Sequence, residues 1–112
     1  MDVTTEREDG VLTARVEGRI DGATAVRFEE AVRTAMEEGD RGLVIDCGKL
    51  SFISSAGLRA VLLTAKALRG RNAGFALCAM SDPVREVFRI SGFDSIVAIH
   101  PTRADALASF DS

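Results

Sequence analysis

Histidine and cysteine are scarce in this chain of 112 residues, which contains one of the former and two of the latter. The single histidine, His100, stands beside Pro101 at the expected end of a strand, so the chain lacks a base suited to activating a nucleophile. One histidine and two widely separated cysteines also lack the ligand spacing of a metal site. We therefore expect no catalytic residues, no bound metal and no cofactor.

Both cysteines, Cys47 and Cys78, lie inside apolar runs, "LVIDC" and "FALCAM". A free thiol in such a run usually behaves as a small buried hydrophobic side chain. We expect both cysteines to be structural, without redox or metal chemistry.

Several sequence signatures of other protein classes are missing. No apolar run approaches the ~18 residues of a membrane span, and the polar, acidic start "MDVTTEREDG" does not resemble a signal peptide. We therefore expect a cytoplasmic protein without membrane contact. Neither a glycine-rich dinucleotide loop nor a phosphate-binding loop occurs. Ile53 stands where a Gly-x-Ser-x-Gly nucleophile elbow around Ser55 would need its first glycine.

The charge balance is acidic, with a formal net charge of −3. Acidic residues are concentrated in Glu29, Glu30, Glu37 and Glu38, and no basic stripe is visible in the sequence. This pattern argues against a nucleic-acid binder that works by neutralising phosphates. With 46% hydrophobic and 28% charged residues, the chain is typical of one globular domain over residues 1–112.

The order of expected elements indicates an α/β fold. Asp9-Gly10 separates two β-favouring runs, which predicts an N-terminal hairpin. Apolar residues at helical spacing then alternate with short apolar runs. Helices are expected over 24–39, 55–70, 81–92 and 102–110, and strands over 42–47, 74–80 and 95–100, with Thr24, Ser55, Asp82 and Thr102 as helix caps. The order β-β-α-β-α-β-α-β-α implies one mixed sheet with four helices packed on it.

The segment "SFISSAG", residues 51–57 and called the serine turn below, places two serines between a strand and a helix. We expect Ser55 to cap the helix. Gly57 follows at a helical position where glycine costs up to ~1 kcal/mol relative to alanine, so we expect something to approach the backbone closely there. A phosphate on Ser55 would be stabilised by the helix N-terminus and by Arg59, one turn on. Phosphorylation would then leave the fold intact and change what can dock on the turn.

The segment "LVIDCGKLSFISSAGLRAVLLTAKALRGRNAGFAL" resembles the STAS domain, specifically the single-domain bacterial anti-sigma factor antagonists. In these, an apolar strand ends in Asp and is followed by Phe-Ile-(Asp or Ser)-Ser-(Ser, Ala or Thr)-Gly-Leu. The segments "VEGRIDGATA" and "AIHPTRADAL" resemble the entry to the first helix and the closing strand and helix of the family, so the resemblance spans nearly the whole chain.

The resemblance implies a protein that binds an anti-sigma factor and thereby frees a sigma factor. That anti-sigma factor is a serine kinase of the histidine-kinase-like ATPase fold, which inactivates its antagonist by phosphorylation, and a PP2C-type serine phosphatase restores it. Aligned on Gly57, the acceptor position of the family falls on Ser55 and its preceding Asp falls on Ser54. The spacing leaves open that Ser54 is itself modified.

The resemblance also implies which residues meet the partner, namely Asp21, Ser54, Ala56, Gly57 and Arg59. For Asp21, whose loop is expected beside the serine turn, a structural role and a partner contact both remain open. For Asp46, the other matching aspartate, we expect a carboxylate that accepts backbone N–H bonds.

Two other functions are compatible with the sequence. STAS domains also serve as accessory subunits of lipid-transport ABC ATPases, as parts of anion transporters, or as other interaction modules outside sigma-factor control, and such a role would need no phosphorylatable serine. An enzyme or carrier of a small ligand would retain that ligand through purification.

Overall fold

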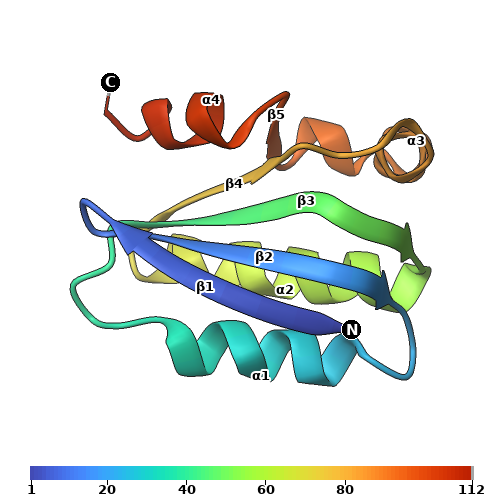
Figure 1. Cartoon of the computed structure of the whole chain (residues 1–112), viewed down its shortest axis with the longest axis horizontal. Helices are drawn as coiled ribbons and strands as arrows, with labels where there is room; N and C mark the ends of the chain where they lie inside the picture. Colours follow the sequence, from blue (N-terminus) through green and yellow to red (C-terminus); the bar gives the residue numbers. More distant parts are fainter. Residues whose placement is uncertain (112) are drawn as a thin grey trace.

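A five-stranded mixed sheet forms the centre of the protein, seen in a computed structural model that describes residues 1–111 (Figure 1). Residue 112, which the expected domain includes, lies outside the described residues. The strands are β1 (Asp2–Glu8), β2 (Val11–Ile20), β3 (Gly42–Ile53), β4 (Gly74–Cys78) and β5 (Ala98–His100), and they lie side by side in that order. β1 pairs antiparallel with β2, and all other neighbours are parallel. The predicted hairpin and mixed sheet are therefore confirmed.

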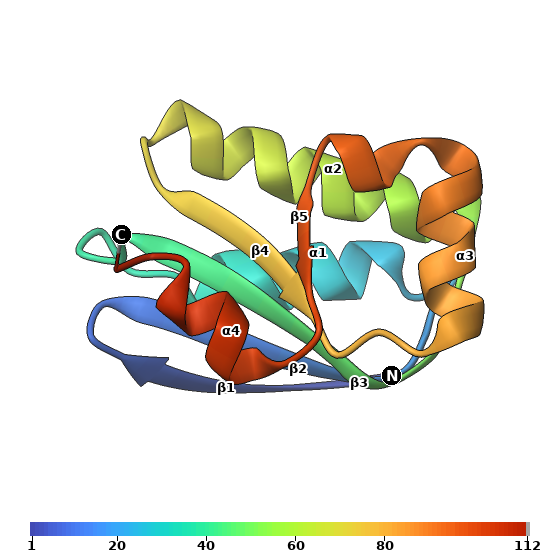
Figure 2. The ribbon, with the colours of Figure 1, turned by 90° about the horizontal axis from the view of Figure 1, so that it is seen from above.

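Four helices flank the sheet, as the sequence predicted. They are α1 (Ala25–Ala35), α2 (Ser55–Gly70), α3 (Asp82–Ser91) and α4 (Arg103–Ala108), with a short 3-10 turn, η1 (Phe93–Ser95), after α3. α1 and α2 cover one face of the sheet and α4 lies on the other, as Figures 1 and 2 show together. Among the described residues, no helix has both the length and the apolar content that crossing a bilayer requires.

The main hydrophobic core lies between the sheet and the pair α1 and α2. Its largest buried side chains include Phe28 of α1 and Leu12, Leu43 and Ile45 of the strands. A smaller cluster on the other face joins the sheet to α4, where the ring of Phe110 packs over Gly42 and Gly74. A Cβ atom at either glycine would lie 2.5 Å or less from that ring, so both positions need glycine to seat the C-terminal segment.

β3 is longer than the sequence predicted. We expected a strand over 42–47, and the observed strand continues to Ile53. The pairing with β2 shifts register twice, between Arg15 and Glu17 and between Gly18 and Arg19, and β-bulges of this kind allow a strand to continue without strict apolar alternation. The longer strand brings the serine turn to the very end of β2. By contrast, the final strand is shorter than the expected 95–100, because Ser95 belongs to η1.

Outside the serine turn, two of the predicted helix caps are wrong. Ser81, not Asp82, caps α3 by accepting a hydrogen bond from the Val84 N–H. Thr24 occupies the N-cap position of α1, but its hydroxyl makes no capping bond and is engaged by the preceding loop. The cap of α4 is as predicted, since Thr102 accepts a bond from the N–H of Asp105.

Candidate functional site

The serine turn lies where β3 passes into α2, at the end of the sheet where β2 also ends. The backbone N–H of Ser54 donates to the carbonyl oxygen of Ile20 at 2.9 Å. Because Ile20 is the last residue of β2, this bond fixes the turn against the loop that begins with Asp21. The expected proximity of the two segments is therefore confirmed.

Ser54 is the helix cap, and the prediction that Ser55 caps α2 is wrong. The side-chain oxygen of Ser54 accepts a hydrogen bond from the Gly57 N–H at 3.2 Å, and Ser54 is half-buried. Ser55 is the first residue of the helix and is exposed. Its hydroxyl makes no hydrogen bond to any of residues 1–111. The two serines therefore have separate roles, one stabilising the helix start and one presenting a free hydroxyl to solvent.

Gly57 is required by the chain's own packing. A Cβ atom there would lie 2.5 Å from the carbonyl oxygen of Ile20 and 2.6 Å from the Cγ1 atom of Ile53. The close approach that the sequence predicted is real, but it comes from β2 and β3 inside the protein. Gly57 is buried, so this packing accounts for the glycine by itself, and its expected contact with a partner stays a prediction. Ala56 is half-buried and Arg59 is exposed, so both remain available at this surface.

Asp21 shapes the neighbouring loop. One carboxylate oxygen accepts a hydrogen bond from the N–H of Ala23 at 3.0 Å, and the other lies 3.5 Å from the Nε atom of Arg19. The hydrogen bond from Ala23, with further help from the Thr24 hydroxyl and Arg19, lowers the pKa of Asp21 below its ordinary value. The carboxylate is therefore ionised at neutral pH and fixes a negative charge beside the serine turn.

Asp46 is not part of this site. It lies eight residues before Ser54 in β3, which corresponds to about 26 Å along an extended strand. Its carboxylate accepts a hydrogen bond from the N–H of Gly48 at 2.9 Å, as expected, and lies 3.7 Å from the Nε atom of Arg15. Asp46 thus stabilises the irregular part of β3.

Both cysteines are free and buried. Burial raises the pKa of the Cys78 thiol to about 11, with a smaller contribution from the charge of Asp46. Burial likewise raises the pKa of the Cys47 thiol. Thiols in this state are poor nucleophiles, which agrees with the structural role expected for them. Within residues 1–111, no three His, Cys, Asp or Glu side chains come together as a metal site would require.

An exposed aromatic ring that the sequence did not predict lies beside the serine turn. The side chain of Phe52 is 39% exposed, and the guanidinium of Arg19 lies 4.2 Å from its ring centroid. Phe52 adjoins the buried Ile53 in β3, and successive strand residues face opposite sides of a sheet. Had β3 been extended through Ile53, this alternation would have indicated the exposed ring. Val26, at the start of α1, adds a second exposed apolar side chain after the Asp21 loop.

The whole chain resembles known proteins. Residues 2–106 match the family model described as "STAS domain". The sequence is 43% identical to BtrV of Bordetella bronchiseptica, a candidate anti-sigma factor antagonist, over 98% of this chain and 95% of that protein. It is 30% identical to the anti-sigma-F factor antagonist RsfB of Mycobacterium tuberculosis, over 94% of this chain and 85% of that protein. The chain therefore belongs to the STAS domain family.

The fold agrees with that assignment. The crystal structure of an anti-sigma factor antagonist from Mycobacterium paratuberculosis superposes with a TM-score of 0.89 at 30% sequence identity, covering 99% of this chain and 94% of that one. RsfB and the Mycobacterium paratuberculosis protein are both named as anti-sigma factor antagonists, and each is matched over most of its length.

Proposed function

We propose that this protein is an anti-sigma factor antagonist that is controlled by phosphorylation of Ser55. In this proposal the unmodified chain binds an anti-sigma factor through the surface around the serine turn, and the sigma factor is released for transcription. The observation that carries the proposal is the exposed and unbonded hydroxyl of Ser55 at the first position of α2. Its full-length relatives, which are named as antagonists, support the same class of function.

The difference between the two serines supports Ser55 as the acceptor. The Ser54 oxygen is already engaged by the Gly57 N–H, and its residue is half-buried. Phosphorylating Ser54 would remove the cap, which contributes about 0.5 to 2 kcal/mol to helix stability. Phosphorylating Ser55 removes no hydrogen bond. Because a kinase must reach the hydroxyl, exposure favours Ser55 as well.

A phosphate on Ser55 would be compatible with the fold and would weaken the binding of a partner. It adds about −1.5 to −2 charge at a helix N-terminus, where free N–H groups and the helix dipole favour an anion. Arg59 is exposed, stands one turn further along α2 and forms no ion pair with residues 1–111, so it is available to the phosphate. Like charges brought together in an interface cost several kcal/mol, and each 1.4 kcal/mol is tenfold in affinity.

The partners in this proposal are proteins. The anti-sigma factor is a serine kinase of the histidine-kinase-like ATPase fold, and a PP2C-type serine phosphatase removes the phosphate. The chain is then the substrate of both enzymes and supplies no catalytic group itself. The surface that meets the kinase comprises Ser55, Ala56 and Arg59 of α2 together with the Asp21 loop and Phe52.

The test uses the kinase-type anti-sigma factors of the source organism, each purified and incubated with this chain, ATP and magnesium. Intact-mass and fragment-ion spectrometry should find one phosphate, located on Ser55. Ser55→Ala should abolish the modification, whereas Ser54→Ala should retain it. A phosphate on Ser54, or no phosphate with any of these kinases, would refute the switch. Co-purification with an ABC-type ATPase instead would indicate the accessory-subunit function.

A further inference from the structure

The outer side of α2 carries a row of positive charge. Arg59, Lys66 and Arg69 are all exposed, and the helix contains no aspartate or glutamate. At 3.6 residues per turn, these three positions and Ser55 fall within about 80° of the helix circumference. The cations therefore form a stripe that begins one turn after Ser55 and runs toward the C-terminal end of α2.

The expectation that the chain has no basic stripe is therefore wrong for α2. The spacings of seven and three residues separate the cations in the printed sequence, and helical geometry brings them onto one side. The net charge of −3 hides the stripe further, because the acidic residues lie on other elements.

These three cations are not used to stabilise the fold. Other exposed or half-buried arginines pair with carboxylates, as Arg7 does with Asp40 and Arg103 with Glu6. None of the three stripe cations forms an ion pair with residues 1–111. Their charges are therefore available to an external anion.

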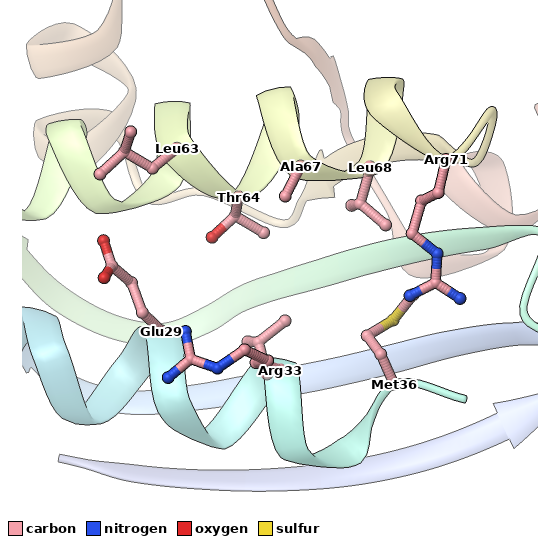
Figure 3. Close-up of a pocket in the computed structure, with 9 residues that line it drawn as sticks. Glu29, Arg33, Met36, Leu63, Thr64, Ala67, Leu68 and Arg71 are labelled. Atoms are coloured by element: carbon pink, nitrogen blue, oxygen red, sulfur yellow. The ribbon is translucent and has the colours of Figure 1, made fainter. Parts of the chain in front are cut away.

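An apolar groove runs beside the stripe, between α1 and α2. Its volume is about 180 Å³. The residues that line it are Glu29, Val32, Arg33, Met36, Leu63, Thr64, Ala67, Leu68 and Arg71. Figure 3 shows Thr64, Leu68 and Arg71 of α2 directed toward α1, with Met36 beneath Arg71 at one end. Leu63 is 42% exposed and lies on the helix between the groove and Lys66, so it belongs to both surfaces.

We propose that the docking surface continues from Ser55 along this stripe, and that it receives an acidic segment of the anti-sigma factor whose apolar side chain packs on Leu63. This inference rests on the proposed function. Charge complementarity favours this occupant, because the unpaired Arg59 and Lys66 lie about one turn before and one turn after the exposed Leu63 and would attract carboxylates around an apolar anchor. From Ser55 to Arg69 the stripe is about 21 Å long, which fits within one side of an ordinary protein interface of about 800 Å².

The position of the stripe also explains how one phosphate could act over a wide surface. A phosphate on Ser55 would sit at the start of the stripe, next to Arg59, and would repel the same acidic segment that the stripe attracts. It would compete for Arg59 as well. Both effects weaken binding, and both act without moving any element of the fold.

The test measures the affinity of purified variants for the anti-sigma factor that phosphorylates the wild-type chain, in 50 mM and 500 mM salt. Lys66→Glu/Arg69→Glu changes the stripe at least 16 Å along the helix from Ser55. We expect its dissociation constant to rise at least tenfold in low salt, with a smaller increase in high salt because salt screens exposed charges. Leu63→Ala should weaken binding about equally in both salts. Urea unfolding checks that each variant is folded.

The matched control is Arg27→Glu/Lys49→Glu, which makes the same change of charge at exposed positions outside α2. Its affinity should stay within threefold of wild type. Equal effects of both double variants, or none in either, would overturn the acidic-segment proposal. So would binding of a single-stranded oligonucleotide that is lost with the stripe variant alone. The proposed function fails separately, if phosphorylation of Ser55 leaves binding by the wild-type chain unchanged.

Discussion

The side-chain oxygen of Ser54 accepts a hydrogen bond from the backbone N–H of Gly57 at 3.2 Å, and this bond begins α2. It assigns the structural task in the serine turn to Ser54. The adjacent Ser55 is exposed and has no bonding partner among the described residues. Its hydroxyl can therefore be modified without loss of a contact that holds the turn together.

The first prediction separates the two serines by stability. Ser54→Ala should lower the free energy of unfolding by about 0.5 to 2 kcal/mol, because an N–H at the helix start loses its acceptor. Ser55→Ala should change it by no more than about 0.5 kcal/mol, as is usual for an exposed position. Urea denaturation of the two variants measures both values. A larger loss for Ser55→Ala would show that the exposed serine is the structural one.

The second prediction concerns the close packing of Gly57 on Ile20. Alanine is the better helix former by up to ~1 kcal/mol, yet Gly57→Ala should destabilise the protein by about 1 to 3 kcal/mol because its Cβ atom would overlap the Ile20 carbonyl oxygen. The control is Gly70→Ala in the same helix, where nothing lies within 4 Å of the added atom. Gly70→Ala should leave stability unchanged or raise it, by up to about 1 kcal/mol. Equal effects of the two substitutions in thermal or urea unfolding would contradict the packing.

The third prediction follows from the pair formed by Arg7 and Asp40. The guanidinium of Arg7 donates to both oxygens of the buried Asp40, at 2.6 and 2.8 Å, and this lowers the pKa of Asp40. The unfolded value is about 3.9. Because the folded pKa is the lower one, the stabilisation is complete above the unfolded pKa and is lost as the pH falls through the folded pKa.

Asp40→Asn should therefore cost about 1 to 3 kcal/mol at pH 7, where a charged hydrogen-bonded group is removed. The difference in unfolding free energy between wild type and Asp40→Asn should be constant above pH 5 and shrink below pH 4. Glu86→Gln serves as the control, because Glu86 pairs with Arg89 on the exposed side of α3. Exposed pairs contribute little, so its effect should stay much smaller than that of Asp40→Asn at every pH. A pH-independent effect of Asp40→Asn would show that the carboxylate charge is irrelevant.

Much of the fold could be predicted because periodic apolar residues indicate each element directly. The spacing of Phe28 and Val32 predicted α1, and "GLVIDC" predicted the buried half of β3. The second half of β3 contains polar residues and two register shifts, so no simple period marks it. Its length depends on pairing with β2, which local sequence does not express.

The geometry of the serine turn could be predicted in outline, whereas its details differ from the expectation. The sequence placed an exposed serine and a close-packed glycine at the helix start. The sequence could not show which of the two adjacent serines is the cap, because serine suits the cap at either position. The choice depends on where β3 ends. Nor could it show that Gly57 packs against Ile20, since that contact joins residues 37 positions apart.

The most direct test compares the affinity of two forms of the wild-type chain for its anti-sigma factor by isothermal titration calorimetry. One form is unmodified and the other carries a phosphate on Ser55. We predict that the phosphate raises the dissociation constant at least a hundredfold, which corresponds to about 2.8 kcal/mol, while circular dichroism and urea unfolding remain the same. Equal affinities of the two forms would contradict the claim that the charge of the phosphate blocks docking. A phosphorylated form that has lost its fold would contradict the claim that it does so without changing the structure.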